Sequence, residues 1–395
     1  MNPPLRMSLF AYGFRPFFLG AALYAVWGAL GWILVWAGHV DFQPALPAML
    51  WHAHEMVFGF LAAALAGFLL TAVPNWTGAA PLRGKGLALL FVLWSAGRVG
   101  AWTVADSAPM TFALLDICFL PALAAWAGQA IIKARLLRNL PLVGLIVVLS
   151  GTNLAVHLDA VGMWQGAARP ALHLAIGIVA MLVAIIGGRI IPAFTRNALR
   201  GAGLQTEPAD KPALDKAAII STPLCFLADA AGFPDPAIAG LAALAAVLNF
   251  VRLLGWRPAT AFGMPIVWVL HLGYAWLIVG FGMWALSAGF GIGTPSMALH
   301  AFTLGAFGTM ILGVMSRASL GHTGRPIRAD GWLVLAYLLV TVATAGRAII
   351  GPAFGGDIEQ ELIGVSGGLW ASAFAVFGVR FISILMLSRP DGRPG

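Results

Sequence analysis

Residues 52–74 read HAHEMVFGFLAAALAGFLLTAVP, an apolar run that opens with two histidines and a glutamate. About 20 consecutive apolar residues are enough for a helix to cross the hydrocarbon core of a bilayer. Twelve such runs follow one another along the chain, at residues 16–38, 52–74, 86–105, 110–132, 140–158, 170–192, 213–232, 235–255, 262–288, 295–317, 330–350 and 362–387. The sequence therefore predicts an all-α polytopic membrane protein with twelve transmembrane helices, in a single integral membrane domain over residues 1–395.

The composition agrees with this prediction. Of the 395 residues, 60% are hydrophobic and 10% are charged, and the mean hydropathy is +0.90, whereas about a quarter of a soluble domain is charged. The net charge of +8 does not indicate a nucleic-acid partner, because the basic residues fall in short loops between apolar runs. Cys118 and Cys225 lie within apolar runs and no C-x-x-C pair is present, which argues against a disulfide framework, a thiolate zinc site and covalently attached c-type haem.

The basic residues predict the orientation of the chain. With a cytoplasmic N-terminus, 19 of the 23 Lys and Arg residues fall on the inner side. Acidic residues such as Asp41, Asp106 and Asp159 lie at or near the outer ends. The positive-inside rule then places both termini in the cytoplasm. The first run follows Arg6 and Arg15 and is too long for the apolar region of a signal peptide, so we expect an uncleaved first helix.

Three of the runs resemble one another. Each has a histidine near its outer end and a threonine just past its inner end, as the pairs His54 and Thr77, His173 and Thr195, and His300 and Thr323. The intervals between histidine and threonine are 23, 22 and 23 residues. This pattern predicts three successive four-helix repeats, at residues 1–138, 139–257 and 258–395. Chance resemblance in an apolar, glycine-rich background is an equally weighted alternative.

The strongest local signal for metal chemistry is Trp51-His52-Ala53-His54-Glu55-Met56. Imidazole is a good ligand for iron and copper, and ionisable groups in a membrane are costly enough to indicate function. On an α-helix His52 and His54 point about 200° apart, so they face different sites unless the first turn is unwound. The alternative is that both are interfacial histidines hydrogen-bonded to water.

Further histidines complete the set of candidate metal ligands. His173 and His300 lie at about the depth of His54, so a compact bundle could bring all three into one layer between helix axes about 8–10 Å apart. His157 could join this layer. His271 lies nearer the middle of the membrane, where a structural hydrogen bond explains it as well as ligation does.

Glu55 and Asp116 are acidic residues placed within spans. Either could relay protons or orient a ligating imidazole. Ion pairing with Arg98 is an equally weighted alternative.

An inner-side motif at residues 315–326 is rich in donors and cations, among them Arg317, His322 and Arg325. It could bind an anion or a lipid headgroup, or it could cap and anchor the end of a helix.

Four motifs occur in order along the chain: GFRPFF at residues 13–18, WHAHEM at 51–56, GRIIPAFTRN at 188–197 and SRASLGHTGRP at 316–326. With these motifs the chain resembles the NnrS family over nearly its whole length. The resemblance implies a bacterial inner-membrane protein that binds haem and copper. It also implies a link to denitrification and to protection against nitrosative stress, the damage that nitric oxide causes.

From the histidine pattern and this resemblance together, we expect His54 and His300 to bind the haem. His52, His173, His157 and His271 are then the candidate ligands of a second metal. The haem is expected to be b-type.

Twelve helices in three groups of four, with histidines on the second, sixth and tenth, are also the arrangement of the haem-copper oxidases and nitric oxide reductases. The chain departs from that superfamily in detail, because its seventh span lacks an adjacent histidine pair and no histidine follows two residues after His300. Oxygen reduction with proton pumping is therefore not expected.

The preferred interpretation is a haem- and copper-binding membrane protein in which nitric oxide is sensed, sequestered or converted. Conversion would need electrons from quinol or a protein donor, because the sequence has no cytochrome c domain or flavin fold. The alternative is a secondary transporter or metal-ion permease with internal repeats, whose histidines line the substrate pathway.

Overall fold

The computed structural model describes residues 7–393, and within them the regular elements are helical. Met7 and Leu387 form an isolated antiparallel bridge, but no β-strand occurs in this part of the chain. The predicted all-α fold is therefore confirmed. Arg6, one of the charges expected on the inner side, lies outside the described residues.

Eleven helices of the described chain, some built from consecutive segments, are long and apolar enough to cross a membrane. They cover Phe14–Trp36, Ala48–Thr77, Lys85–Thr103, Pro109–Lys133, Leu137–Ala160, Ala168–Gly201, Asp235–Gly255, Pro265–Phe290, Pro295–His322, Gly331–Phe354 and Gly356–Met386. Each overlaps one of the apolar runs of the sequence. The chain is thus a multi-pass membrane protein.

The remaining predicted span, 213–232, also forms a helix, α9 (Pro212–Ala230). It is less apolar than the other eleven because it contains Asp215, Lys216 and Asp229. The Asp215 carboxylate accepts a hydrogen bond from Nε of Arg252 over 2.6 Å. One of these charges is therefore balanced by a neighbouring helix.

The chain divides into two compact units. Unit 1 comprises residues 7–175, Arg317–Pro326 and 377–393, and unit 2 comprises Ile176–Ser316 and Ile327–Val376. Three helices run from one unit into the other: α8 (Ala168–Gly201), α13 (Thr309–His322) and α16 (Gly356–Met386).

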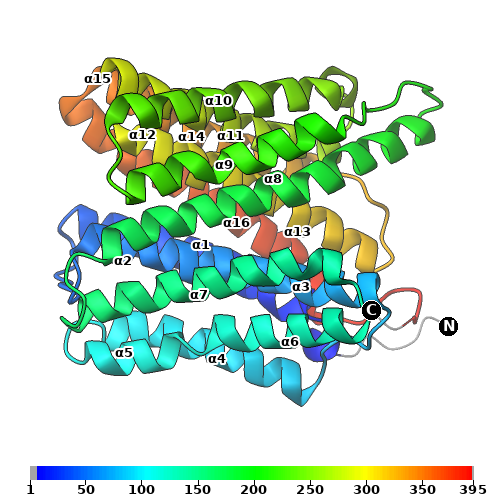
Figure 1. Cartoon of the computed structure of the whole chain (residues 1–395). Helices are drawn as coiled ribbons and strands as arrows, with labels where there is room; N and C mark the ends of the chain where they lie inside the picture. Colours follow the sequence, from blue (N-terminus) through cyan, green and yellow to red (C-terminus); the bar gives the residue numbers. More distant parts are fainter. Residues whose placement is uncertain (1–6, 394–395) are drawn as a thin grey trace. The chain divides into compact units, whose positions relative to one another are not determined.

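The other segments of unit 1 are η1 (Leu9–Ala11), α1 (Phe14–Trp36), α2 (Ala48–His54), η2 (Glu55–Leu61), α3 (Ala62–Thr77), α4 (Lys85–Thr103), α5 (Pro109–Asp116), α6 (Phe119–Lys133), η3 (Leu137–Asn139) and α7 (Leu140–Ala160). Within this unit α1 packs on α3, α4 on α5, and α6 on α7 (Figure 1). These contacts bring the polar ends of α2, α5 and α7 together.

Besides α9, unit 2 contains α10 (Asp235–Gly255), η4 (Pro258–Ala261), α11 (Pro265–Phe290), α12 (Pro295–His300), η5 (Ala301–Gly308), α14 (Gly331–Ala345), η6 (Gly346–Ile350) and α15 (Gly351–Phe354). Here α10 contacts both α9 and α11, and α11 contacts α12 and η5.

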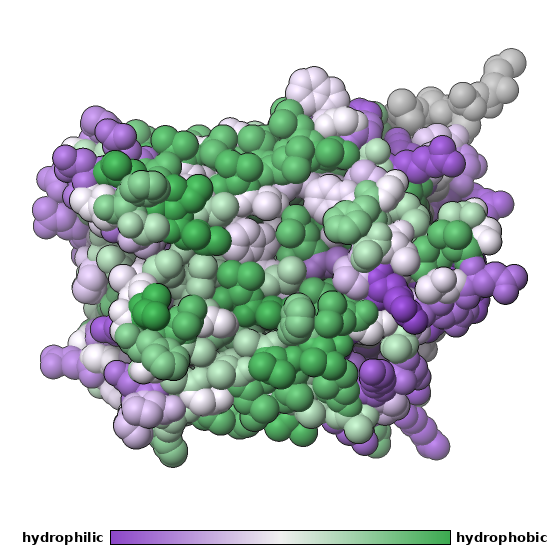
Figure 2. All heavy atoms as spheres, turned by 90° about the horizontal axis from the view of Figure 1, so that it is seen from above, coloured by the Kyte–Doolittle hydropathy of each residue, from purple (hydrophilic) through white to green (hydrophobic). Residues whose placement is uncertain are grey.

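Large apolar side chains are exposed on many helices, as expected for surfaces that face lipid. Leu23, Trp27 and Val379 are 58%, 60% and 80% exposed. Soluble monomers rarely expose contiguous apolar surface of this extent. Hydrophobic side chains cover most of the middle of the face in Figure 2, and hydrophilic side chains gather toward its two ends.

Three π-helical segments interrupt the α-helices, each at a polar residue. Segment η2 begins directly after His54, η5 begins directly after His300, and η6 contains Arg347. A π-turn closes i→i+5 hydrogen bonds and so holds one more residue than an α-turn, and such turns are frequent at functional sites. In contrast, α8 is α-helical on both sides of His173.

The same close packing recurs in the two units. In unit 1, Gly59 lies against Tyr24 and Gly67 against Phe18; in unit 2, Gly305 lies against Trp276 and Gly313 against Leu270. The paired glycines are 246 residues apart and their paired partners are 252 residues apart. Helix α1 therefore packs against α2–α3 in the same register in which α11 packs against α12–α13.

Candidate metal centre

His54 and Glu55 enter the interior of unit 1 where α2 meets η2. Trp51, one turn earlier, donates from Nε1 to the carbonyl oxygen of Ala101 over 3.1 Å, and this anchors the start of the helix. Both His54 and Glu55 are 1% exposed. His52 points elsewhere, with its ring stacked on Trp32 at 4.4 Å between centroids. The two histidines thus have different surroundings, as expected for an intact helical turn.

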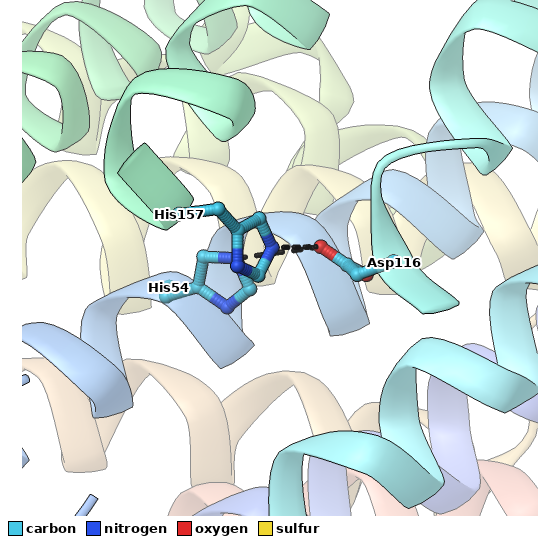
Figure 3. A group of neighbouring side chains, drawn as sticks. All are labelled: His54, Asp116 and His157. Carbon is cyan, nitrogen blue, oxygen red and sulfur yellow. Dashed lines mark hydrogen bonds and ion pairs between the residues drawn. The ribbon is translucent and has the colours of Figure 1, made fainter. Parts of the chain in front are cut away.

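Asp116, at the end of α5, and His157, in the last turn of α7, meet His54. Oδ2 of Asp116 lies 3.0 Å from Nε2 of His157 and 3.4 Å from Nε2 of His54. The two imidazole rings are 5.0 Å apart between centroids. Figure 3 shows both rings directed at the carboxylate, and one ligand atom from each of the three residues lies within 4.8 Å of the others.

Asn153 connects Asp116 to His54. Its Nδ2 donates to Oδ2 of Asp116 over 2.8 Å, and its Oδ1 lies 2.8 Å from Nε2 of His54. The amide nitrogen faces a carboxylate, so the oxygen is left to accept from the imidazole. Asn153 and His157 are four residues apart on α7, which places both on one face of the helix.

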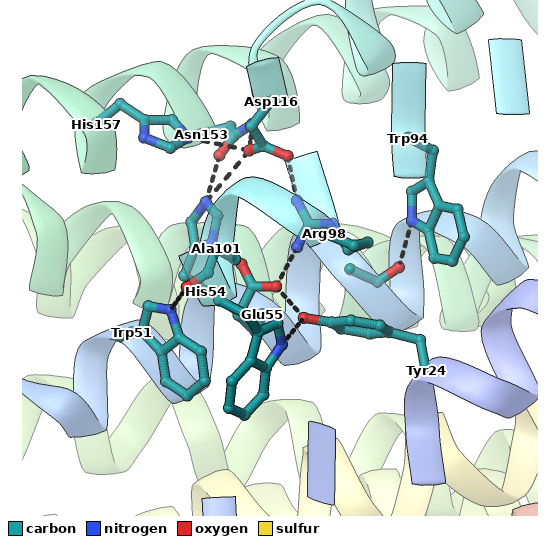
Figure 4. Close-up of polar contacts among 12 residues, drawn as sticks. Tyr24, Trp51, His54, Glu55, Trp94, Arg98, Ala101, Asp116, Asn153 and His157 are labelled. Atoms are coloured by element: carbon teal, nitrogen blue, oxygen red, sulfur yellow. Dashed lines mark hydrogen bonds and ion pairs between the residues drawn. The ribbon is translucent and has the colours of Figure 1, made fainter. Parts of the chain in front are cut away.

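Arg98 of α4 joins the two carboxylates of the cluster. Its Nη1 donates to Oε2 of Glu55 over 2.6 Å, and its Nη2 donates to Oδ1 of Asp116 (Figure 4). The guanidinium side chain is 5% exposed. The ion pairing that the sequence offered as an alternative role for Glu55 and Asp116 is therefore present.

An aromatic shell closes the cluster on the side of α1. The Tyr24 hydroxyl donates to Oε2 of Glu55 and accepts from Nε1 of Trp102 over 3.2 Å. Trp94 donates from Nε1 to the carbonyl oxygen of Gly59 over 2.9 Å, within η2. A π-turn leaves backbone carbonyls less regularly paired, so this bond from a neighbouring helix supports it.

The hydrogen bonds define the charge of the cluster. Nδ1 of His54 lies 2.8 Å from Oε1 of Glu55, so both ring nitrogens of His54 face acceptors. With both ring nitrogens protonated, an imidazolium at His54 together with Arg98 would balance the carboxylates of Glu55 and Asp116. Buried charges need such pairing, because leaving one partner uncompensated costs several kcal/mol, of order 3–5. Two imidazoles and a carboxylate are also a ligand set for a transition-metal ion.

The other predicted ligands lie outside this cluster. His173 is half-buried in α8. In unit 2, Nε2 of His271 lies 2.9 Å from Oγ1 of Thr195, whose hydroxyl donates to the carbonyl oxygen of Ile191 over 2.8 Å. The imidazole therefore donates from Nε2, and its buried Nδ1 has no hydrogen-bond partner within residues 7–393. This is the structural hydrogen bond that the sequence offered as an alternative to ligation.

His300 lies at the junction of α12 and η5 in unit 2. Its Nδ1 is 2.7 Å from the carbonyl oxygen of Ser296 and 3.2 Å from the Ser296 hydroxyl. A carbonyl only accepts hydrogen bonds, so Nδ1 carries the proton. Fixing Nδ1–H in this way is how proteins orient an imidazole that ligates a metal through Nε2.

The inner-side motif is held by contacts of a structural kind. Arg389 donates from Nη1 to the carbonyl oxygen of His322 over 3.0 Å, and the ring of His322 lies 5.6 Å from that of Phe14. Nη1 of Arg325 reaches the Thr323 carbonyl at 3.5 Å, and burial lowers the pKa of the Arg325 guanidinium. These contacts favour the helix-capping interpretation of His322. Arg317 lies in the same helix, α13.

The motif GFRPFF has a structural role that the sequence did not reveal. Nη1 of Arg15 reaches the carbonyl oxygens of Ile384, Leu385 and Leu387 at 3.2, 2.9 and 2.7 Å. Carbonyls at the end of a helix lack intrahelical partners, and Arg15 satisfies those of α16.

Sequence reasoning missed Asn153 and Tyr24 as members of the cluster. The spacing Asn153-x-x-x-His157 is a helix-face signal that could have pointed to the first. Tyr24 has no such signal, because its contact with Glu55 depends on how α1 packs against η2.

Comparison with known proteins gives one clear result. The family model described as NnrS protein matches residues 8–389. A search of curated proteins found no match to the chain. Because the matched region covers nearly the whole sequence, the chain belongs to the NnrS family.

Proposed function

We propose that this chain is a bacterial inner-membrane protein, with both termini in the cytoplasm, that binds a transition-metal ion at His54, Asp116 and His157 and handles nitric oxide. The observation that carries the proposal is the buried arrangement of these three side chains, with ligand atoms within 4.8 Å of one another. Copper and a b-type haem are the cofactors that we propose.

The donor set fits a copper ion. Imidazole nitrogens suit copper, and the neighbouring groups resemble the outer contacts that orient metal ligands. Asn153 and Arg98 hold the Asp116 carboxylate in place. A monovalent cation bound between the histidines would replace the second ring proton of His54, so the net charge of the cluster would not change. Charge therefore favours copper in its monovalent state.

Haem fits the residues around His300 better than those around His54. His54 offers a ring nitrogen within 4.8 Å of ligand atoms of Asp116 and His157, a spacing that suits one small metal ion shared by the three side chains. His300 has Nδ1 fixed by Ser296 and Nε2 available for an axial bond. We therefore assign His300 to haem and move His54 from haem to the second metal, together with His157.

Haem iron or copper with an open coordination position would supply the site at which nitric oxide binds. The residues of the chain would control the access of water and protons to this site. The buried cluster excludes water, and Glu55, Asp116 and the histidines form a connected path of groups that can hold a proton. Electrons for any conversion would come from quinol or a protein donor.

We also propose that the chain consists of three four-helix repeats, as in a haem-copper-oxidase-like bundle. The contacts of Gly59 and Gly67 that recur at Gly305 and Gly313 support a duplication of the first and last repeats. A π-turn follows His54 and His300 but not His173, and one extra residue accounts for intervals of 23, 22 and 23 residues. The threonines at the ends, Thr77, Thr195 and Thr323, donate to the carbonyl four residues earlier.

An absorption spectrum combined with metal analysis of the purified chain tests this proposal. We expect a Soret band and bound copper, with the Soret band altered in His300→Ala and copper bound more weakly in His157→Ala. A chain without haem or copper that mediates uptake of a substrate or metal ion into vesicles would instead support the transporter or permease alternative.

A further inference from the structure

Arg347, which is largely buried, has the local setting of Arg98 without carboxylates at the two corresponding positions. Arg98 follows Ser95-Ala96-Gly97, and Arg347 follows Thr344-Ala345-Gly346. The glycine before each arginine faces a polar side chain from the next membrane-spanning helix. At Gly97 this side chain is Asp116; at Gly346 an added Cβ would lie 2.6 Å from Oγ of Ser366. Ser366 therefore occupies in unit 2 the place of Asp116 in unit 1.

The second acidic partner is also missing. Glu55 directly follows His54, whereas Ala301 directly follows His300. The two carboxylates that pair with Arg98 thus correspond to a serine and an alanine around Arg347. Unit 2 therefore has an arginine at the position of Arg98 but no carboxylate at the positions of Glu55 and Asp116.

The contacts of Arg347 show an incomplete set of partners. Nη2 donates to the Ser296 hydroxyl over 3.1 Å. Nη1 is buried and has no hydrogen-bond partner among the described residues. Oε1 of Glu359 forms an ion pair with Nη1 at 3.9 Å, which is beyond hydrogen-bond distance, so this half-exposed carboxylate leaves the N–H donors of Nη1 unsatisfied. A guanidinium carries five N–H donors in a planar fork, and a buried donor left unsatisfied costs free energy.

His300 adds no negative charge to this group. Its Nδ1–H is directed at the Ser296 carbonyl, and the Ser296 hydroxyl, which lies 3.2 Å from the same nitrogen, accepts the hydrogen bond from Arg347. The side chain of Arg347 is 14% exposed, against 5% for Arg98. The Arg347 side chain is therefore more accessible than that of Arg98.

We propose that Arg347 and Ser296, beside His300, form a binding site for a planar oxyanion, a carboxylate or nitrite, that takes the place of the carboxylates of unit 1. The guanidinium fork matches the two oxygens of such an anion, and these charge-assisted bonds are the strong ones. The anion would satisfy Nη1 and neutralise the buried cation. Its source is either a small free anion or a carboxylate group of the haem.

Calorimetric titration of the purified full-length chain with sodium nitrite and with sodium acetate tests this site, with haem content measured in parallel. We expect Arg347→Gln to weaken binding by about tenfold or more, because charge-assisted hydrogen bonds are lost. Glu359→Gln should strengthen binding, since it removes the carboxylate at 3.9 Å. Ser366→Asp should abolish binding with Arg347 intact, because it restores an internal partner. Arg169→Gln, which removes an exposed charge, is the control and should bind as the wild type does.

The titration also separates the two sources. Binding of either probe identifies a small free anion. Loss of haem from both Arg347→Gln and Ser366→Asp, with neither probe bound by the wild type, identifies a haem carboxylate. The proposal is overturned if the wild type binds neither probe and these two variants keep their haem, or if Arg347→Gln binds the probes as tightly as the wild type does.

Discussion

Oδ1 of Asn153 lies 2.8 Å from Nε2 of His54, although the two residues are 99 positions apart in the chain. This contact joins α7 to the junction of α2 and η2 and fixes the ring of His54 beside Asp116. The side-chain amide of Asn153 has one acceptor atom, Oδ1, and the His54 imidazole donates to it. The geometry of the cluster therefore depends on a neutral residue as much as on its charged ones.

Removal of Arg98 should destabilise the protein strongly. Arg98→Gln would leave two carboxylates buried without their cation, a change that typically costs about 3–5 kcal/mol. Thermal unfolding in detergent should show a clear fall in Tm. Arg98→Lys keeps the charge but loses the planar fork, so its Tm should lie between those of Arg98→Gln and the wild type. Equal Tm values for all three proteins would show that the ion pairs contribute little.

The close approach at Gly59 can be tested with a methyl group. A Cβ at this position would clash with the Tyr24 ring and lie 2.9 Å from Nη1 of Arg98. We expect Gly59→Ala to lower Tm and reduce metal content. Gly144→Ala is the matched control, because nothing lies within 4 Å of its added Cβ and alanine favours the helix by about 0.5–1 kcal/mol. A Gly59→Ala protein as stable as Gly144→Ala would contradict the packing described for η2.

Arg15 should matter for stability and not for metal binding. Arg15→Ala would leave the carbonyls of Ile384, Leu385 and Leu387 without this donor. Hydrogen bonds to charged groups contribute about 1.5–3 kcal/mol each, so Tm should fall while copper and haem per folded protein stay constant. Loss of metal from protein that unfolds at the normal temperature would give Arg15 a different role.

Much of this structure follows from local composition. The apolar runs predicted the helices because a span needs only length and low polarity, and the one less apolar run, α9, differs because of charges such as Asp215. Glu55 and Asp116 stood out because acidic residues within spans are rare. Their common partner Arg98 was one of two alternatives, since the pairing depends on how α4 packs against α5 and η2. The contacts of Asn153 and Tyr24 were beyond sequence reasoning for the same reason.

The π-turns were also not predictable. A π-turn inserts one residue without changing the hydropathy of the span. The interval of 23 residues between His54 or His300 and its threonine therefore did not reveal the π-turn that causes it. The expected layer of His54, His173 and His300 stays a prediction, because it involves both units.

The orientation in the membrane can be tested with reporter fusions. The distribution of basic residues predicts that fusions after Leu137 and Leu199 report the cytoplasm and that fusions after Gln43 and Gly355 report the outside. Opposite results at two of these positions would overturn the orientation.

The most direct test of the metal centre is electron paramagnetic resonance of the purified full-length chain, loaded with one equivalent of monovalent copper and then oxidised to Cu²⁺, the state that this method detects. We predict nitrogen hyperfine structure from two imidazoles in the wild type and in His322→Ala, and from one imidazole in His157→Ala. His54→Ala should likewise lose one nitrogen, and Asp116→Asn should bind copper more weakly. An unchanged spectrum and copper content in folded His54→Ala and His157→Ala would contradict the assignment of the metal to this cluster.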